Sequence, residues 1–178
     1  GVLVLRPAPL QLTWIGYPNT TGLPPAAVDY RVTDLYADPE ETCQRHTEKL
    51  VRLPHSFLCY TPHQPLQPIA PLPALANGFV TFGTFNTLAK LTPDTLKVFA
   101  RVLLAVPRSR AVLKAKPFGS KLVRERYFEQ FAAHGIERAR VQLLGLIPHS
   151  TDHLQTYGLM DISLDPFPYA GTTTTCEA

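Results

Sequence analysis

The chain has 178 residues, of which 45% are hydrophobic and 17% charged, a balance that argues against disorder and allows one large domain or parts of two. Its net charge of +3 is too small for a nucleic-acid partner but suits a small anionic ligand. The three cysteines lack the spacing of a zinc ribbon or a disulfide framework, and no apolar run reaches the ~18 residues of a membrane span, so we expect a reducing compartment and no membrane partner.

Residues 1–61 differ in sequence pattern from the rest of the chain. They begin with apolar residues but with neither methionine nor a secretory leader, and the chain ends abruptly at Ala178, so we expect a piece of a longer protein. Residues 10–18 and 28–34 are rich in β-branched and aromatic side chains, which predicts two strands. Residues 38–53 have acidic side chains near their start and basic ones near their end, which predicts a helix because this order suits the helix dipole.

A proline-rich connector is predicted at residues 62–77. Five prolines fall between Pro62 and Pro73. Because proline cannot donate a backbone hydrogen bond to a helix interior or to a central strand, we expect this stretch to be extended and semi-rigid.

Residues 78–178 alternate strand-like and helix-like segments with short connections. Strands are predicted at residues 79–86, 110–117, 140–147 and 161–167, and helices at residues 92–107, 120–135, 150–160 and from 172 onward. The clearest helix has Thr92 as its cap and Pro93 in its first position. Its apolar stripe comprises Leu96, Phe99, Leu103 and Val106. The alternation predicts an α/β fold with a Rossmann-like parallel sheet and crossover helices.

Polar side chains gather at the predicted carboxyl ends of these strands, where open parallel sheets bind ligands. The first strand is followed by Asn86, Thr87 and Lys90, the third by His149 and His153, and the fourth by Thr172–Thr175 and Glu177. The threonine run could bind phosphate through N–H groups and hydroxyls at a helix start, or one threonine could simply cap the helix. Lys90 could stabilise a departing diphosphate, His153 could contact a phosphate and Glu177 could bind ribose hydroxyls, although each could equally be a surface side chain.

Several catalytic signatures are missing from the chain. It contains neither GxGxxG nor GxxxxGK[ST], which argues against a classical dinucleotide-binding fold and a P-loop. It also lacks HExxH, clustered Cys/His spacings and GxSxG, so we expect no metal, no cofactor and no serine-hydrolase triad.

Three long segments, residues 6–34, 79–96 and 160–178, resemble the catalytic region of glycosyltransferase family 41. They read RPAPLQLTWIGYPNTTGLPPAAVDYRVTD, FVTFGTFNTLAKLTPDTL and MDISLDPFPYAGTTTTCEA. This family contains the O-linked N-acetylglucosamine transferases and the SPINDLY proteins. The residues of these segments and the short connector, which leaves no room for the long inserted domain of the animal-type enzymes, are closer to SPINDLY.

The resemblance implies a GT-B architecture of two Rossmann-like lobes. Residues 1–61 would form the last part of the N-terminal lobe, and residues 62–77 would connect the two lobes. Residues 78–178 would form the first part of the C-terminal, nucleotide-sugar-binding lobe. It further implies inverting, metal-independent transfer from a nucleotide sugar, UDP-N-acetylglucosamine or GDP-fucose, to Ser or Thr of nuclear and cytoplasmic proteins, with tetratricopeptide repeats upstream. The alternative is a non-catalytic nucleotide-binding scaffold beside such repeats.

The same resemblance implies roles for individual residues. Lys90 would be the catalytic residue that stabilises the leaving diphosphate. Nucleotide contacts would come from Thr87, Lys90, His153, Thr173, Thr174 and Glu177, the last on the ribose. Ile15 and Gly16 would approach the donor sugar. Thr87 and Thr172 stand where animal-type enzymes have glutamine and histidine, which leaves the choice of donor open.

Overall fold

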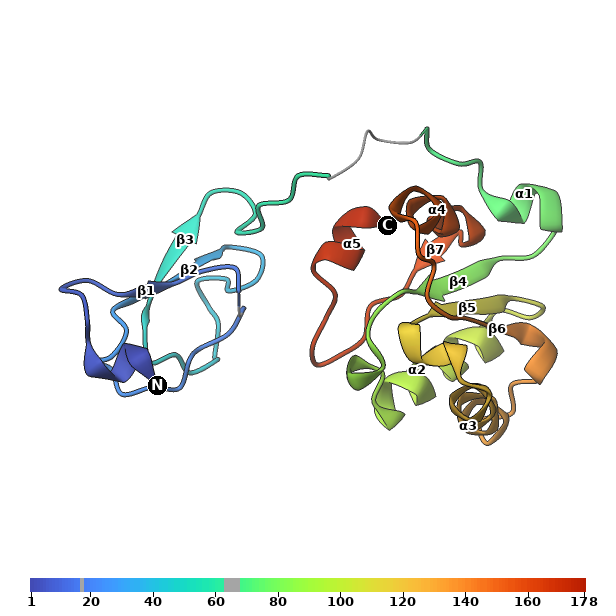
Figure 1. Ribbon diagram of the computed structural model, residues 1–178, viewed down its shortest axis with the longest axis horizontal. Coiled ribbons are helices and arrows are strands. Elements are labelled where there is room, and N and C mark those ends of the chain that lie inside the picture. Colours follow the sequence, from blue (N-terminus) through green and yellow to red (C-terminus); the bar gives the residue numbers. More distant parts are fainter. Residues whose placement is uncertain (17, 63–67) are drawn as a thin grey trace. The chain divides into compact units, whose positions relative to one another are not determined.

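The computed structural model describes residues 1–16, 18–62 and 68–178 of the chain, which divides into two compact units (Figure 1). The first unit comprises Gly1–Thr61 and the second Pro62–Ala178. The predicted strand at residues 10–18 and the predicted connector at residues 62–77 each lie in part outside the described residues. In the described ranges, no helix has the length and apolarity needed to cross a bilayer.

In the first unit, the described residues form a three-stranded parallel sheet in the order β1, β2, β3. The strands are Leu12–Thr13, Tyr30–Asp34 and Lys49–Leu53, and a short 3-10 helix, η1, covers Val2–Leu5. The predicted strands at residues 10–18 and 28–34 therefore correspond to β1 and β2, with β1 much shorter than expected.

The helix predicted at residues 38–53 is wrong. Residues 38–48 form turns and irregular backbone, and the following five residues form β3. Charged side chains of this segment make specific tertiary contacts instead: Asp38 binds Arg31, and Glu48 binds Thr21. The Thr42 hydroxyl also accepts the Gln44 N–H at 3.3 Å, a local bond that competes with helix formation.

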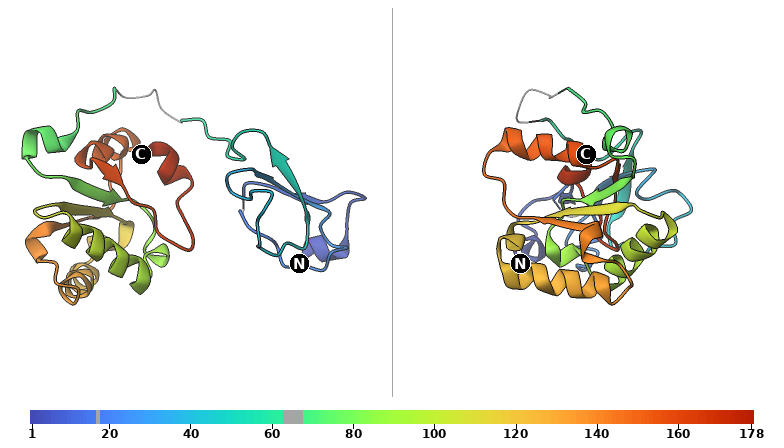
Figure 2. Two further views of the ribbon diagram at one scale, coloured as in Figure 1. Left: turned by 180° about the vertical axis from the view of Figure 1, so that it is seen from behind. Right: turned by 90° about the vertical axis from the view of Figure 1, so that its right-hand side faces the viewer.

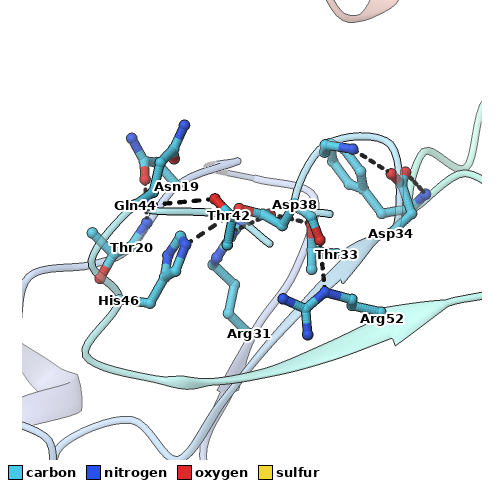
Figure 3. Close-up of polar contacts among 12 residues, drawn as sticks. Asn19, Thr20, Arg31, Thr33, Asp34, Asp38, Thr42, Gln44, His46 and Arg52 are labelled. Carbon is cyan, nitrogen blue, oxygen red and sulfur yellow. Dashed lines mark hydrogen bonds and ion pairs between the residues drawn. The ribbon is translucent and has the colours of Figure 1, made fainter. Parts of the chain in front are cut away.

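One face of the first sheet carries a buried polar core (Figure 3). Arg31 and Thr33 are two residues apart on β2, so their side chains lie on the same face of the sheet. Both side chains donate to the Asp38 carboxylate. His46 Nε2 lies 3.3 Å from Asp38 Oδ1, and Arg52 Nε donates to the Asp38 carbonyl at 2.6 Å. The loop after β2 is therefore held by charges rather than by apolar packing.

The described part of the second unit contains a four-stranded parallel sheet in the order β6, β5, β4, β7. The strands are β4 (Thr81–Thr84), β5 (Arg110–Lys114), β6 (Val141–Leu144) and β7 (Ile162–Ser163). The helices are α1 (Pro73–Asn77), α2 (Pro93–Ala105), α3 (Lys121–Ala132), α4 (Ser150–Gln155) and α5 (Thr173–Glu177). Short 3-10 turns complete the unit: η2 (Leu88–Lys90), η3 (Lys116–Gly119), η4 (Arg138–Arg140) and η5 (Thr156–Leu159). The predicted alternation of strands and helices is confirmed.

Two separate apolar layers cover the second sheet. Figures 1 and 2 show α2 and α3 on one face and α4 on the other. Phe82 and Leu113 belong to the core under α2 and α3, whereas Val112 packs with Tyr157 and Met160 on the opposite face. Because side chains alternate along a strand, Lys114 lies on the same face as Val112.

The predicted signals of α2 are confirmed. The Thr92 side chain accepts the Thr95 N–H at 3.2 Å, and Pro93 is the first helical residue. Leu96, Phe99 and Leu103 are buried.

The fully extended connector is wrong in its last part, which forms α1 from Pro73 onward. A proline in the first helical position loses only an N–H that the helix does not use. The Asp161 carboxylate accepts the next N–H, that of Ala74, at 2.8 Å, which stabilises the helix start.

Candidate functional site

The carboxyl edge of the second sheet brings together most of the side chains predicted to bind a ligand. All the paired strands of this sheet run parallel, so their carboxyl ends meet at one edge. The residues that hydrogen bonds and ion pairs join there are Asn86, Lys90, Lys114, His153, Tyr157, Asp165, Thr174, Thr175 and Glu177.

Asp165 organises the loop between β7 and α5. Its carboxylate accepts the Gly171 N–H at 3.2 Å and the Thr175 hydroxyl at 2.9 Å. Asn86, which is buried, donates to Asp165 at 3.4 Å and accepts the Thr174 hydroxyl at 3.2 Å. A β-carbon on Gly171 would lie only 2.7 Å from Asp165 Oδ1, so the loop can close this tightly only with glycine there.

The threonine run begins α5 without a side-chain cap. Thr172 occupies the cap position, and its side chain makes no cap hydrogen bond. Thr173 is the first helical residue, while the hydroxyls of Thr174 and Thr175 are bonded to Asn86 and Asp165. Of the two possibilities left open by the sequence, simple capping by one threonine is therefore not observed.

Lys90 extends from η2 to the loop that precedes α5. Its ammonium donates to the Ala170 carbonyl at 2.8 Å and lies 4.5 Å from the centre of the Tyr169 ring. These contacts place the charge on the loop that leads into the threonine run. Thr87 is exposed at the start of η2, three residues before Lys90.

Lys114, His153, Tyr157 and Glu177 form a polar group that we call the Lys114 quartet. Lys114 Nζ is 2.6 Å from His153 Nδ1, and His153 Nε2 is 3.2 Å from Glu177 Oε2. The Tyr157 hydroxyl donates to the same Glu177 oxygen at 2.7 Å. Burial lowers the pKa of Lys114, and the Glu177 carboxylate opposes this shift by favouring the ammonium.

The predicted donor-sugar residues lie in the first unit, in the turn after β1. Ile15 has a φ of +56°, which is rare for a β-branched residue and costs on the order of 1–3 kcal/mol. The Gly16 N–H donates to the Trp14 carbonyl at 2.6 Å. The turn is therefore tight, and the Ile15 side chain is 39% exposed.

Three residues at the sheet edge, Lys114, Tyr157 and Asp165, were not predicted from the sequence. The signal for Lys114 was its position in the second half of the strand predicted at residues 110–117, toward the edge where ligands bind. Asp165 could have been found in the same way, because it closely follows β7. Tyr157 has no sequence signal that separates it from an ordinary core tyrosine. Among residues 1–16, 18–62 and 68–178, no three His, Cys, Asp or Glu side chains are grouped as metal ligands would be.

Comparisons with known proteins show which family the chain resembles. The model of glycosyl transferase family 41 matches residues 1–69. Proteins named "Probable UDP-N-acetylglucosamine--peptide N-acetylglucosaminyltransferase SPINDLY" from Petunia hybrida and Arabidopsis thaliana are 61% and 60% identical over 178 residues. Both matches cover the whole of this chain but only 19% of the relative. The corresponding transferase named SEC from Arabidopsis thaliana is 27% identical over 97% of this chain and 18% of its own length.

A solved structure agrees with these matches. A mutant O-GlcNAc transferase of Thermobaculum terrenum superposes with a TM-score of 0.82 and 38% identity, over 97% of this chain and 32% of that chain. The predicted GT-B architecture and the greater similarity to SPINDLY than to SEC are thereby confirmed. The chain is therefore similar to glycosyltransferase family 41 along residues 1–69 and to SPINDLY proteins over its whole length.

Proposed function

We propose that this chain supplies the donor-binding part of a protein O-glycosyltransferase. The enzyme transfers N-acetylglucosamine or fucose from UDP-N-acetylglucosamine or GDP-fucose to Ser and Thr hydroxyls of nuclear and cytoplasmic proteins. Transfer inverts the anomeric centre and uses no metal. The observation that carries the proposal is the Lys90 ammonium, held 2.8 Å from the Ala170 carbonyl beside the threonines that begin α5.

The charges at this edge suit a nucleoside diphosphate. When the sugar leaves, negative charge builds on the diphosphate, and a preorganised ammonium stabilises it. A charge-assisted bond from Lys90 to phosphate is stronger than the bond that it makes to the neutral Ala170 carbonyl, so a donor can displace this contact. Thr173 and Thr174 supply N–H and hydroxyl donors at the start of α5, which follows this loop, and Thr87 contacts the nucleotide near Lys90.

The ribose is assigned to Glu177, whose carboxylate can accept two hydroxyl hydrogen bonds. His153 contacts the same part of the donor, since its Nε2 lies 3.2 Å from Glu177. In the first unit, Ile15 and Gly16 form the donor-sugar contact. The relatives' names refer to N-acetylglucosamine transfer, while the likeness to SPINDLY also admits fucose, so both donors need to be tested.

The test uses a protein of the relatives' length that contains this chain. Each labelled donor is incubated with a Ser/Thr peptide in the presence of a metal chelator, and the anomeric configuration of the product is determined by NMR. We expect transfer from one of the two donors. Transfer from neither would refute the enzyme and leave a nucleotide-binding scaffold as the function. Imaging of the tagged protein in cells tests the nuclear and cytoplasmic location.

Lys90→Ala separates catalysis from binding. Removing a group that stabilises the leaving diphosphate should lower the transfer rate by ~10²–10³-fold. Donor binding should change much less, because the stabilisation develops in the transition state. Lys97→Ala, on the exposed side of α2, is the matched control. An equal loss of binding and of rate in Lys90→Ala would contradict the role assigned to Lys90.

A further inference from the structure

The Lys114 quartet contains one cation site that the family resemblance does not assign. Lys114 is the last residue of β5, and its side chain lies on the sheet face that carries Val112, Tyr157 and Met160. Its ammonium is 2.6 Å from His153 Nδ1 and 5.2 Å from the centre of the Phe85 ring. The residue is half-buried, so its contacts are made away from bulk water.

The hydrogen-bond chemistry of the quartet restricts its protonation. An ammonium can only donate, so His153 Nδ1 must accept from Lys114. The ring then has its proton on Nε2, which donates to Glu177 Oε2 at 3.2 Å. Tyr157 donates to the same oxygen at 2.7 Å, so the carboxylate receives two donors. One positive and one negative charge are thus linked through a neutral imidazole.

With Glu177 ionised and one positive charge shared between Lys114 and His153, only one other arrangement satisfies these contacts. A neutral Lys114 amine could accept a proton from an imidazolium, whose second N–H would still reach Glu177. The two arrangements differ only in which side chain has the positive charge. The groups that face His153 from the packed elements are Lys114 from β5, Tyr157 from η5 and Glu177 from α5, with the Phe85 ring 6.3 Å away.

We propose that Lys114 is a positioning residue of the donor site, which holds the cation of the quartet and keeps His153 a neutral bridge to Glu177. The side chain acts through His153 and not by touching the reacting atoms. By balancing the Glu177 carboxylate, it prevents a bare negative charge from repelling an anionic nucleotide. This role rests on the proposed function, because it is needed only if a nucleotide binds at Glu177.

The charge state of His153 can be measured directly in the 178-residue chain. With ¹⁵N-labelled histidine, long-range ¹⁵N–¹H spectra distinguish a ring protonated on Nε2 alone from one protonated on both nitrogens, and His153→Gln assigns the signals. Near neutral pH we expect only Nε2 of His153 to be protonated. In Lys114→Met, at the same pH, a larger share of the His153 rings should be protonated on both nitrogens, because Glu177 then lacks another cation.

Two further variants make this result specific. Lys114→Arg restores a donor-only cation and should keep His153 neutral. Lys116→Met removes the same charge two residues further along at an exposed position and should behave as the wild type. A doubly protonated ring in the wild type, or the same protonation of His153 in Lys114→Met as in the wild type, would overturn the proposal.

Titration with GDP and UDP tests the consequence for binding. At alkaline pH, Lys114→Met should bind the nucleotide about tenfold more weakly than the wild type, the effect of one unit charge at roughly 10 Å and an effective dielectric constant of about 20. The deficit should shrink as the pH is lowered, because a second proton on the His153 ring replaces the lost charge. A deficit that does not change with pH would indicate a merely structural role and refute the proposal. If neither GDP nor UDP binds the wild type, the proposed function fails, while the NMR result still decides where the cation of the quartet is held.

Discussion

Glu48 makes the stability of the first unit depend on pH, because the unit loses stability in acid. Its side chain is 5% exposed and immediately precedes β3. One carboxylate oxygen accepts the Thr21 N–H at 2.8 Å and the Thr21 hydroxyl, and the other accepts the Thr20 hydroxyl at 2.7 Å. Burial by itself would raise the pKa of Glu48, but these hydrogen bonds outweigh it and lower the pKa from its ordinary value of 4.5 to about 2.

The magnitude follows from linkage. Because the pKa of Glu48 is lower in the folded state, the carboxylate stabilises the fold above pH 4.5, and this contribution is lost as the pH falls toward about 2. At ~1.4 kcal/mol per pKa unit, it amounts to about 3 kcal/mol. Glu48→Gln removes the charge while keeping the size of the side chain. At pH 7 the variant should therefore be less stable by about 3 kcal/mol.

The chain contains a suitable reporter, because its single tryptophan, Trp14, is in the first unit. The indole N–H donates to the Phe57 carbonyl at 2.8 Å, so unfolding of this unit changes its surroundings. Urea unfolding followed by Trp14 fluorescence should give a stability gap between wild type and Glu48→Gln that closes between pH 4.5 and about 2. Glu40→Gln, an exposed position, should show no such gap. A gap that stays constant down to pH 2.5 would refute the linkage.

Three further substitutions test the packing of the two units. Asp38→Ala leaves the Arg31 guanidinium buried without its carboxylate, so the Trp14-reported unfolding free energy should fall by ~3–5 kcal/mol. Phe118→Ala leaves a cavity at a fully buried site, so the unfolding free energy of the second unit should fall by ~3–5 kcal/mol. Circular dichroism should then show a lower thermal midpoint, while the unfolding transition reported by Trp14 stays unchanged. Gly83→Ala adds a β-carbon 2.9 Å from Met160 Cβ. Thermal unfolding followed by circular dichroism should show that the unfolding free energy of the second unit falls by ~1–3 kcal/mol.

The sequence predicted the second unit well because its signals are local. The Thr92 cap, the Pro93 start and the apolar stripe of α2 each act within one helix, and the structure contains all three. Short connections between alternating strands and helices leave few topologies other than a parallel sheet. The polar residues after each strand then necessarily meet at one edge, which is why the sequence alone was enough to associate Lys90 with the threonine run.

The first unit was predicted less well because its residues are fixed by contacts distant in sequence. Residues 38–53 have the charge order of a helix, but Glu48 binds Thr20 and Thr21, and Asp38 binds Arg31 on β2. Neither partner is visible in a window of one helix length. Tertiary hydrogen bonds of this kind override a weak local preference.

The Lys114 quartet depends on a packing detail that no motif contains. Gly83 in β4 has no side chain, and Met160 at the end of η5 occupies the space where a β-carbon would lie. The segment that contains α4 and η5 can therefore approach the sheet closely, which brings His153 within 2.6 Å of Lys114 and Tyr157 within 2.7 Å of Glu177. A larger residue at position 83 would push this segment outward and lengthen both contacts. The chemistry of the donor site thus depends on an apolar contact several residues away from it, and sequence reasoning that looks only for polar residues cannot find it.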